Sequence, residues 1–117
     1  MAAPNIVNVA TITGKTAVQA VGTSATAIVT NSSGSGKVFK VNTLYVANVD
    51  GVAAADITVD LFRASTAYPI ASTISVPADA SLDIVAKAIY LEEGDSLRCT
   101  ASASGDLTAV CSYEEIS

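Results

Sequence analysis

The sequence predicts an all-β protein of short antiparallel strands, and three observations support this prediction. In the segment 73–117, short apolar runs alternate with turn residues at 77–79, 93–95 and 104–106. The segment Asp56–Arg63 alternates strictly between apolar and polar residues, as a half-buried strand does. Half of all residues are apolar, yet aromatic residues make up only 5%, so the core must consist mainly of Ala, Val and Ile.

The N-terminal third predicts three strands and a loop. Asn5–Thr13 alternates well enough to form a first strand, with Val7 and Val9 on one face. The Ala and Val content of Lys15–Asn31 also permits a helix, but its threonines and Gly22 favour two strands with a break near Gly22. The run Asn31–Gly36 is rich in Ser and Gly and predicts a flexible loop.

The middle of the chain predicts three more strands. Val38–Val49 is rich in β-forming residues, and a turn signal, Asp50-Gly51, follows it. Asp56–Arg63 is the most regular strand of the chain. Ala67–Val76 repeats the alternation more loosely and ends at Pro77.

Two structures are compatible with the segment Ala78–Glu93. Asp79 could cap a helix that Gly94 stops, or Leu82, Ile84 and Ala86 could alternate along two short strands or one bulged strand. Because strands are predicted on both sides, the strand interpretation is favoured.

The C-terminal segment predicts a hairpin around the loop Ser104–Asp106. A loop of this length places Ala103 opposite Leu107, and therefore Cys99 opposite Cys111. Two facing cysteines could form a cross-strand disulfide, or they could remain two reduced thiols in a core. We expect reduced thiols, since a protein made in a cytosol is kept reduced.

Length and charge restrict the organisation and the partners of the chain. A length of 117 residues fits a single domain, 1–117, in which residues 1–8 could form an N-terminal arm. Six Lys and Arg are scattered among eleven Asp and Glu, which argues against a nucleic-acid partner. A mean hydropathy of +0.48 is high for a soluble monomer and indicates surface that is covered in an assembly.

No membrane segment or secretory signal is predicted. The longest stretch without charge, 16–36, contains too many Ser, Thr, Asn and Gly residues for a transmembrane helix. The N-terminus has neither a basic region nor an apolar run, so we expect no secretory signal.

The residues predict no enzyme, cofactor or metal site. The chain has no His to activate a serine, and each of its two Gly-Lys pairs, at Gly14 and Gly36, lacks the first Gly of a phosphate-binding loop. The acidic residues near the strand ends have no calcium-loop spacing and are expected to form a solvated rim. The tyrosines could form a surface that stacks on sugars, or they could simply lie between core and solvent: Tyr45, Tyr68, Tyr90 and Tyr113.

Three segments resemble a group of small virion structural proteins of tailed bacteriophages, of the type found in cyanophages. They are KVNTLYVANVDG at Lys40–Gly51, the segment Ile57–Val85, and the segment Ile89–Ser117 with its strings YLEEGDSL and SYEEIS. The resemblance implies an antiparallel β-sandwich, jelly-roll-like, of about eight strands. It implies no catalytic residue.

The resemblance, together with the apolar composition, suggests a capsid decoration (cement) protein that bridges capsid subunits. A tail, neck, baseplate or fibre-attachment component, or a carbohydrate-binding host-recognition module, are the alternatives. We expect a virion location after synthesis in the host bacterial cytoplasm, and the major capsid protein or another virion protein as partner. We also expect a homo-oligomer, with a trimer favoured because it fits sites of local threefold symmetry on a capsid. A dimer is the alternative, since dimers are commoner among oligomers in general.

Contacts with neighbours are expected through an edge strand, the N-terminal arm and the loop that follows residue 30. An apolar arm with no charged side chain is suited to adding a strand to a neighbour. The candidate interface residues are Met1, Pro4, Ile6, Val7, Asn31, Ser33, Gly34 and Lys37, and the candidate thiol pair is Cys99 and Cys111.

Overall fold

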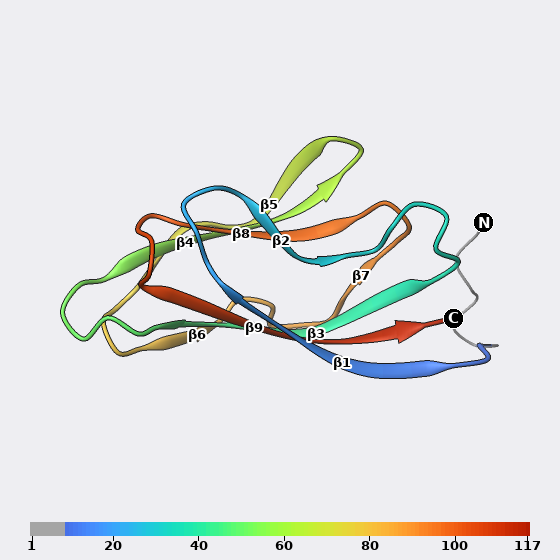
Figure 1. Cartoon of the computed structure of the whole chain (residues 1–117), viewed down its shortest axis with the longest axis horizontal. Helices are drawn as coiled ribbons and strands as arrows, with labels where there is room; N and C mark the ends of the chain where they lie inside the picture. The colour runs from blue at the N-terminus through green and yellow to red at the C-terminus, as the bar shows by residue number, and fades with distance from the viewer. Residues whose placement is uncertain (1–8) are drawn as a thin grey trace.

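The computed structural model describes residues 9–117, which form nine strands in two packed antiparallel sheets and contain no helix (Figure 1). The strands are β1 (Ile12–Ala20), β2 (Thr26–Thr30), β3 (Val38–Asn48), β4 (Ala55–Arg63), β5 (Thr66–Val76), β6 (Ser81–Asp83), β7 (Ile89–Leu91), β8 (Ser96–Ala101) and β9 (Leu107–Ile116). This confirms the predicted all-β sandwich.

The two sheets have the strand order of a jelly roll. One sheet runs β1-β9-β3-β6, with β7 also paired to β3, and the other runs β2-β8-β4-β5. Strands β6 and β7 pair with different stretches of β3, around Val46 and around Lys40, so together they act as one interrupted strand. Counted this way, the fold has two four-stranded sheets, joined by connections that cross from one sheet to the other.

The core lies between the sheets and is built from small and medium-sized side chains. Inward-facing residues of both sheets are almost fully buried, because every second residue of a strand faces the other sheet. The largest of those less than 2% exposed are Leu44, Ile57, Leu91, Leu97 and Leu107, and the core also contains the aromatic ring of Phe39, at 6% exposed. A core of this kind agrees with the composition, in which Val, Ile and Ala replace aromatic residues.

Several predicted elements are confirmed. Residues 15–31 contain β1 and β2 with a break at 21–25, and no helix. Residues 78–93 contain the two short strands β6 and β7, as the strand interpretation required. Of the predicted first strand, Asn5–Thr13, only residues 12 and 13 lie in a described strand, however. The chain bends at Ala10 and β1 begins at Ile12, while residues 5–8 of the predicted strand lie outside the described residues.

The predicted C-terminal hairpin is wrong. Strand β8 pairs with β4 and β2 in one sheet, and β9 pairs with β1 and β3 in the other, so residues 102–106 connect the two sheets. Cys99 lies opposite Val59, and Cys111 lies opposite Leu44. The alternation correctly identified the buried face of β8 and of β9. It did not distinguish two strands paired in one sheet from two strands in facing sheets, because both arrangements bury the same side chains.

Candidate functional site

The outer face of the sheet that contains β1 carries an exposed apolar row, which we call the outer row: Val18, Val110 and Tyr45. These residues are register partners on the adjacent strands β1, β9 and β3. Val18 is 75% exposed, Val110 40% and Tyr45 48%. Three neighbouring apolar side chains in solvent are more typical of an interaction surface than single exposed residues are.

A shallow apolar hollow lies beside the outer row, between β1 and β9. Its lining is almost entirely apolar and comes from Val18, Gln19, Ala20, Thr108, Ala109 and Val110. The register places Ala20 opposite Thr108, next to the pair Val18 and Val110. The small side chain of Ala20 leaves space that the larger valines enclose, so this face could receive a small apolar group of a partner.

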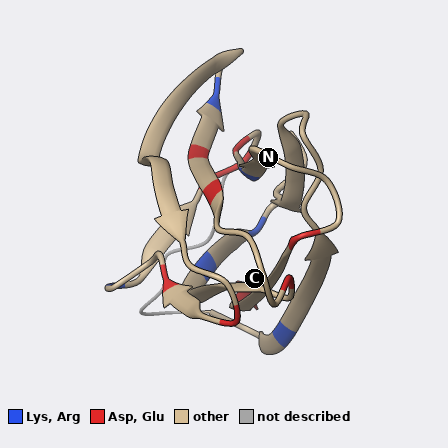
Figure 2. Ribbon diagram, turned by 90° about the vertical axis from the view of Figure 1, so that its left-hand side faces the viewer, with Lys and Arg blue, Asp and Glu red and all other residues tan. Residues whose placement is uncertain are grey.

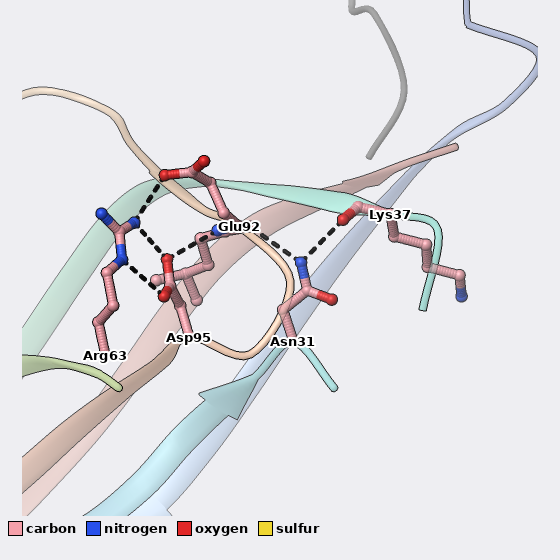
Figure 3. A network of polar contacts seen from close by, with 6 residues as sticks. Asn31, Lys37, Arg63, Glu92 and Asp95 are labelled. Atoms are coloured by element: carbon pink, nitrogen blue, oxygen red, sulfur yellow. Dashed lines mark hydrogen bonds and ion pairs between the residues drawn. The ribbon is translucent and has the colours of Figure 1, made fainter. Parts of the chain in front are cut away.

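Arg63 ties the β4–β5 hairpin to the turn between β7 and β8 (Figure 3). Its Nε donates to Asp95 Oδ1 at 2.8 Å, and its Nη2 donates to Asp95 Oδ2 and to Glu92 Oε2. The backbone N–H of Glu92 also donates to Asp95 Oδ2, at 2.9 Å. The hydrogen bond from Arg63 holds the pKa of Asp95 below its usual value, although burial of the carboxylate opposes this shift.

The loop predicted to be flexible is bound at several points through Asn31 (Figure 3). The side-chain amide of Asn31 donates to the carbonyls of Lys37 and Leu91, both at 2.9 Å, and its Oδ1 accepts from Ser35 Oγ. Its backbone N–H donates to the Asp95 carbonyl. Asn31 is fully buried, so this candidate interface residue stabilises the fold and does not face solvent. Residues that follow it in the loop are exposed.

The other candidate residues of this loop have different surroundings. Ser33 and Gly34 are exposed, whereas Lys37 is half-buried and its Nζ contacts Glu115 Oε1 at 3.2 Å. Lys15 reaches Glu115 Oε2 at 3.1 Å. Burial alone would raise the pKa of Glu115, but the hydrogen bonds from the two lysines outweigh it and lower the pKa. Met1, Pro4, Ile6 and Val7, the candidate arm residues, lie outside the described residues.

Cys99 and Cys111 are both free and fully buried in the core between the sheets. Burial raises the pKa of Cys99 to about 12, and the nearby Cys111 and Asp60 add to the shift. Burial raises the pKa of Cys111 to about 11. At neutral pH both groups are therefore thiols, which react far more slowly than thiolates.

Apart from these ion pairs, charged and metal-binding groups do not gather into a site within residues 9–117. Lys and Arg, like Asp and Glu, occur at scattered positions over both sheets (Figure 2). The described residues contain no cluster of His, Cys, Asp and Glu able to hold a metal ion. This part of the chain also contains no helix that is long and apolar enough to cross a membrane.

The tyrosines do not form one surface. Tyr45 and Tyr90 lie on the same sheet, but Tyr90 is opposite Lys40, roughly 16 Å along β3 from Tyr45 at the usual strand rise. Tyr68 lies on the other sheet. Tyr113 packs against Phe39, with 5.5 Å between the ring centroids. This dispersion argues against a sugar-stacking platform.

The sequence did not predict the outer row. It placed Tyr45 in a strand, but Val18 and Val110 come from segments far apart in the chain. Only the register of β9 with both β1 and β3 places the three residues side by side. The only signal in the sequence was an apolar residue at an outward-facing position of a strand whose inward-facing positions are already apolar.

Comparison with known proteins identifies the fold and no family. No protein-family model matches the chain, and no curated protein matches it. A solved structure from Bacillus endospore appendages, described as a novel family of disulfide-linked pili, aligns with a TM-score of 0.52 at 14% identity, over 92% of this chain and 88% of its own. This likeness shows that the two proteins share a fold.

A second solved structure is a pentameric capsid protein isolated from metagenomic phage sequences. It aligns with a TM-score of 0.43 at 19% identity, over 86% of this chain and 60% of its own. At this TM-score the likeness does not add to the fold assignment.

Proposed function

We propose that this protein is a non-enzymatic structural subunit of a phage virion that decorates the capsid and stabilises it by bridging capsid subunits. The observation that carries the proposal is the outer row, in which Val18, Val110 and Tyr45 expose apolar surface side by side. Covering such a surface with a partner is favourable, by about 25 cal/mol for each Å² of apolar area removed from water.

Two further observations support a structural role. The segments Lys40–Gly51, Ile57–Val85 and Ile89–Ser117 resemble small virion proteins of tailed phages. The structural neighbour from Bacillus appendages is described as forming pili, so the same fold supports a repeating assembly elsewhere. Fold alone does not determine function, and the virion assignment therefore rests on the sequence resemblance.

The assembly that we propose is non-covalent. Both cysteines of the chain are buried, so neither sulfur can reach a neighbouring subunit while the domain is folded. Contacts with the capsid would instead use the outer row, the exposed loop residues Ser33 and Gly34, and the N-terminal arm.

The copy number of the chain in purified virus particles tests this proposal. Quantitative mass spectrometry against the major capsid protein should give a count equal to the number of capsid subunits or a simple fraction of it. A few copies to a few dozen would assign the chain to the tail, neck or baseplate instead. Absence from the particles would refute a virion role.

A pair of matched variants tests whether the outer row contacts the particle. Tyr45→Ser removes a 48% exposed ring from the outer row, and Tyr68→Ser removes a 54% exposed ring from the other sheet. We expect Tyr45→Ser to lower occupancy on particles lacking the native protein, and Tyr68→Ser to leave it unchanged. Equal occupancy of both variants would show that another surface binds the shell.

A further inference from the structure

The two sheets have four edges within residues 9–117, and three of these edges carry features that discourage pairing with another chain. Strands β6 and β7 have three residues each. Strand β2 has five residues and a register shift. Strand β5 is long, but it contains Pro69 and its register with β4 shifts twice. Short length, proline and bulges are the usual protections of an exposed edge.

Strand β1 has none of these protections. It is nine residues long and pairs with β9 through nine consecutive partners without a shift, while none of the described strands pairs with its other side. Its one charged side chain, Lys15, is bonded to Glu115 of the same chain at 3.1 Å. An open, regular and nearly uncharged edge of this length is a template for a further strand.

The hydrogen-bond pattern shows which residues this edge offers. Thr11 and Ser117 donate to each other's carbonyls at 2.9 Å, and Val21 N–H donates to the Leu107 carbonyl. In an antiparallel ladder, bonded pairs recur at every second residue. The odd-numbered residues of β1 therefore bond to β9. The even-numbered residues direct their N–H and C=O groups to the open edge: Ile12, Gly14, Thr16, Val18 and Ala20.

We propose that β1 pairs antiparallel with β1 of a second copy of this chain, with Thr16 opposite Thr16 on a two-fold axis. The inference goes beyond the proposed function, because it concerns two copies in solution and holds for any assembly that they enter. An antiparallel pair of identical strands is closed by its two-fold axis. The product is a dimer rather than the trimer that the sequence favoured.

The choice of Thr16 follows from overlap and parity. Only an even-to-even register lets the edge-facing groups of both copies meet, and centring on Thr16 pairs the whole of β1, with Ile12 opposite Ala20. Gly14 then lies opposite Val18 of the second copy. An added Cβ at Gly14 would meet no atom within 4 Å, so this position has open space beside it for the 75% exposed Val18 side chain.

Single-cysteine cross-linking of the full chain tests both the pairing and its register. Thr16→Cys places one sulfur opposite its own copy, at about 5.5 Å between Cα atoms, within disulfide range. The matched control, Ala20→Cys, is exposed on the same strand but would face Ile12 of the second copy. The native thiols are buried. Under mild oxidation, Thr16→Cys should form a covalent dimer and Ala20→Cys should form none. Cross-linking of Ala20→Cys alone would overturn the register.

A second experiment does not depend on cross-linking chemistry. By sedimentation equilibrium, the parent chain should show twice the monomer mass of 11.8 kDa. Thr16→Lys places two like charges opposite each other and should give the monomer mass with an unchanged far-UV spectrum. Ser72→Lys, on the exposed β5 edge, should remain a dimer. A monomeric parent chain would refute the proposal. A dimer that survives Thr16→Lys but is lost on deletion of residues 1–8 would assign the contact to the arm.

Discussion

Cys99 and Cys111 belong to opposite sheets and are both buried in the core between them, although only a short connection separates their strands in the sequence. Cys99 lies on β8 and Cys111 on β9. Burial raises the pKa of Cys99, and the nearby Cys111 raises it further. The relationship indicates two thiols that fill space in a core of small side chains, and it leads to the first prediction.

Replacing both cysteines with Ala should cost about 1 kcal/mol of unfolding free energy for each site, because each loses one buried atom. The stability difference between parent and variant should also depend on pH. The folded-state pKa values, about 12 and about 11, lie above the ordinary thiol value. The contribution is therefore complete below about pH 8.5 and is lost as the pH rises toward 12.

Urea unfolding of parent and double variant at pH 7 and pH 10 measures this difference. Reducing agent should not change the stability of the parent at pH 7. If reducing agent lowers the stability of the parent to that of the variant, a disulfide is present and the free-thiol assignment fails.

Asp95→Asn should lower the unfolding free energy at pH 7 by about 1 to 2 kcal/mol, since it removes the charge that Arg63 binds. Because the hydrogen bond from Arg63 lowers the pKa of Asp95, its contribution is present above about pH 4 and is lost as the pH falls through the folded value. The difference in stability between parent and variant should therefore shrink as the pH falls below about 4. A constant difference from pH 7 to pH 2 would show that the loss is not electrostatic.

The β4–β5 turn should be improved by residues that tolerate positive φ. Ala64 and Ser65 connect the paired residues Arg63 and Thr66, with φ values of 51° and 61°. This is the geometry of a type I′ turn, which favours Asn-Gly. Ser65→Gly should raise the unfolding free energy by about 0.5 to 1 kcal/mol. The matched control Ala67→Gly, in β5, should lower it, and thermal unfolding measures both. A loss of stability in Ser65→Gly would contradict the turn assignment.

Deletion of residues 1–8 should weaken binding to virus particles while leaving the rest of the domain folded. The reason is the apolar, uncharged composition of this segment, which suits strand addition to a neighbour. Particle occupancy by quantitative mass spectrometry and the far-UV spectrum of the isolated chain measure the two effects. Unchanged occupancy would remove the arm from the proposed contacts.

Local pattern in the sequence determined the secondary structure of most of this protein. Strict alternation located β4, and the turn residues at 77–79 and 93–95 separated the short strands that follow β5. Gly22 and the threonines around it correctly divided 15–31 into two strands. These signals are local, because the pleat and the turn types depend on neighbouring residues.

Only the tertiary structure decided which strands become neighbours. Alternation identifies the buried face of β8 and β9, but it does not distinguish a hairpin partner from a strand in the facing sheet, since both bury the same side chains. The same limit hid the outer row, whose three residues meet only through the register of β9 with β1 and β3. The open edge of β1 likewise depends on which strand occupies its other side, and that is settled by long-range packing of the whole sandwich.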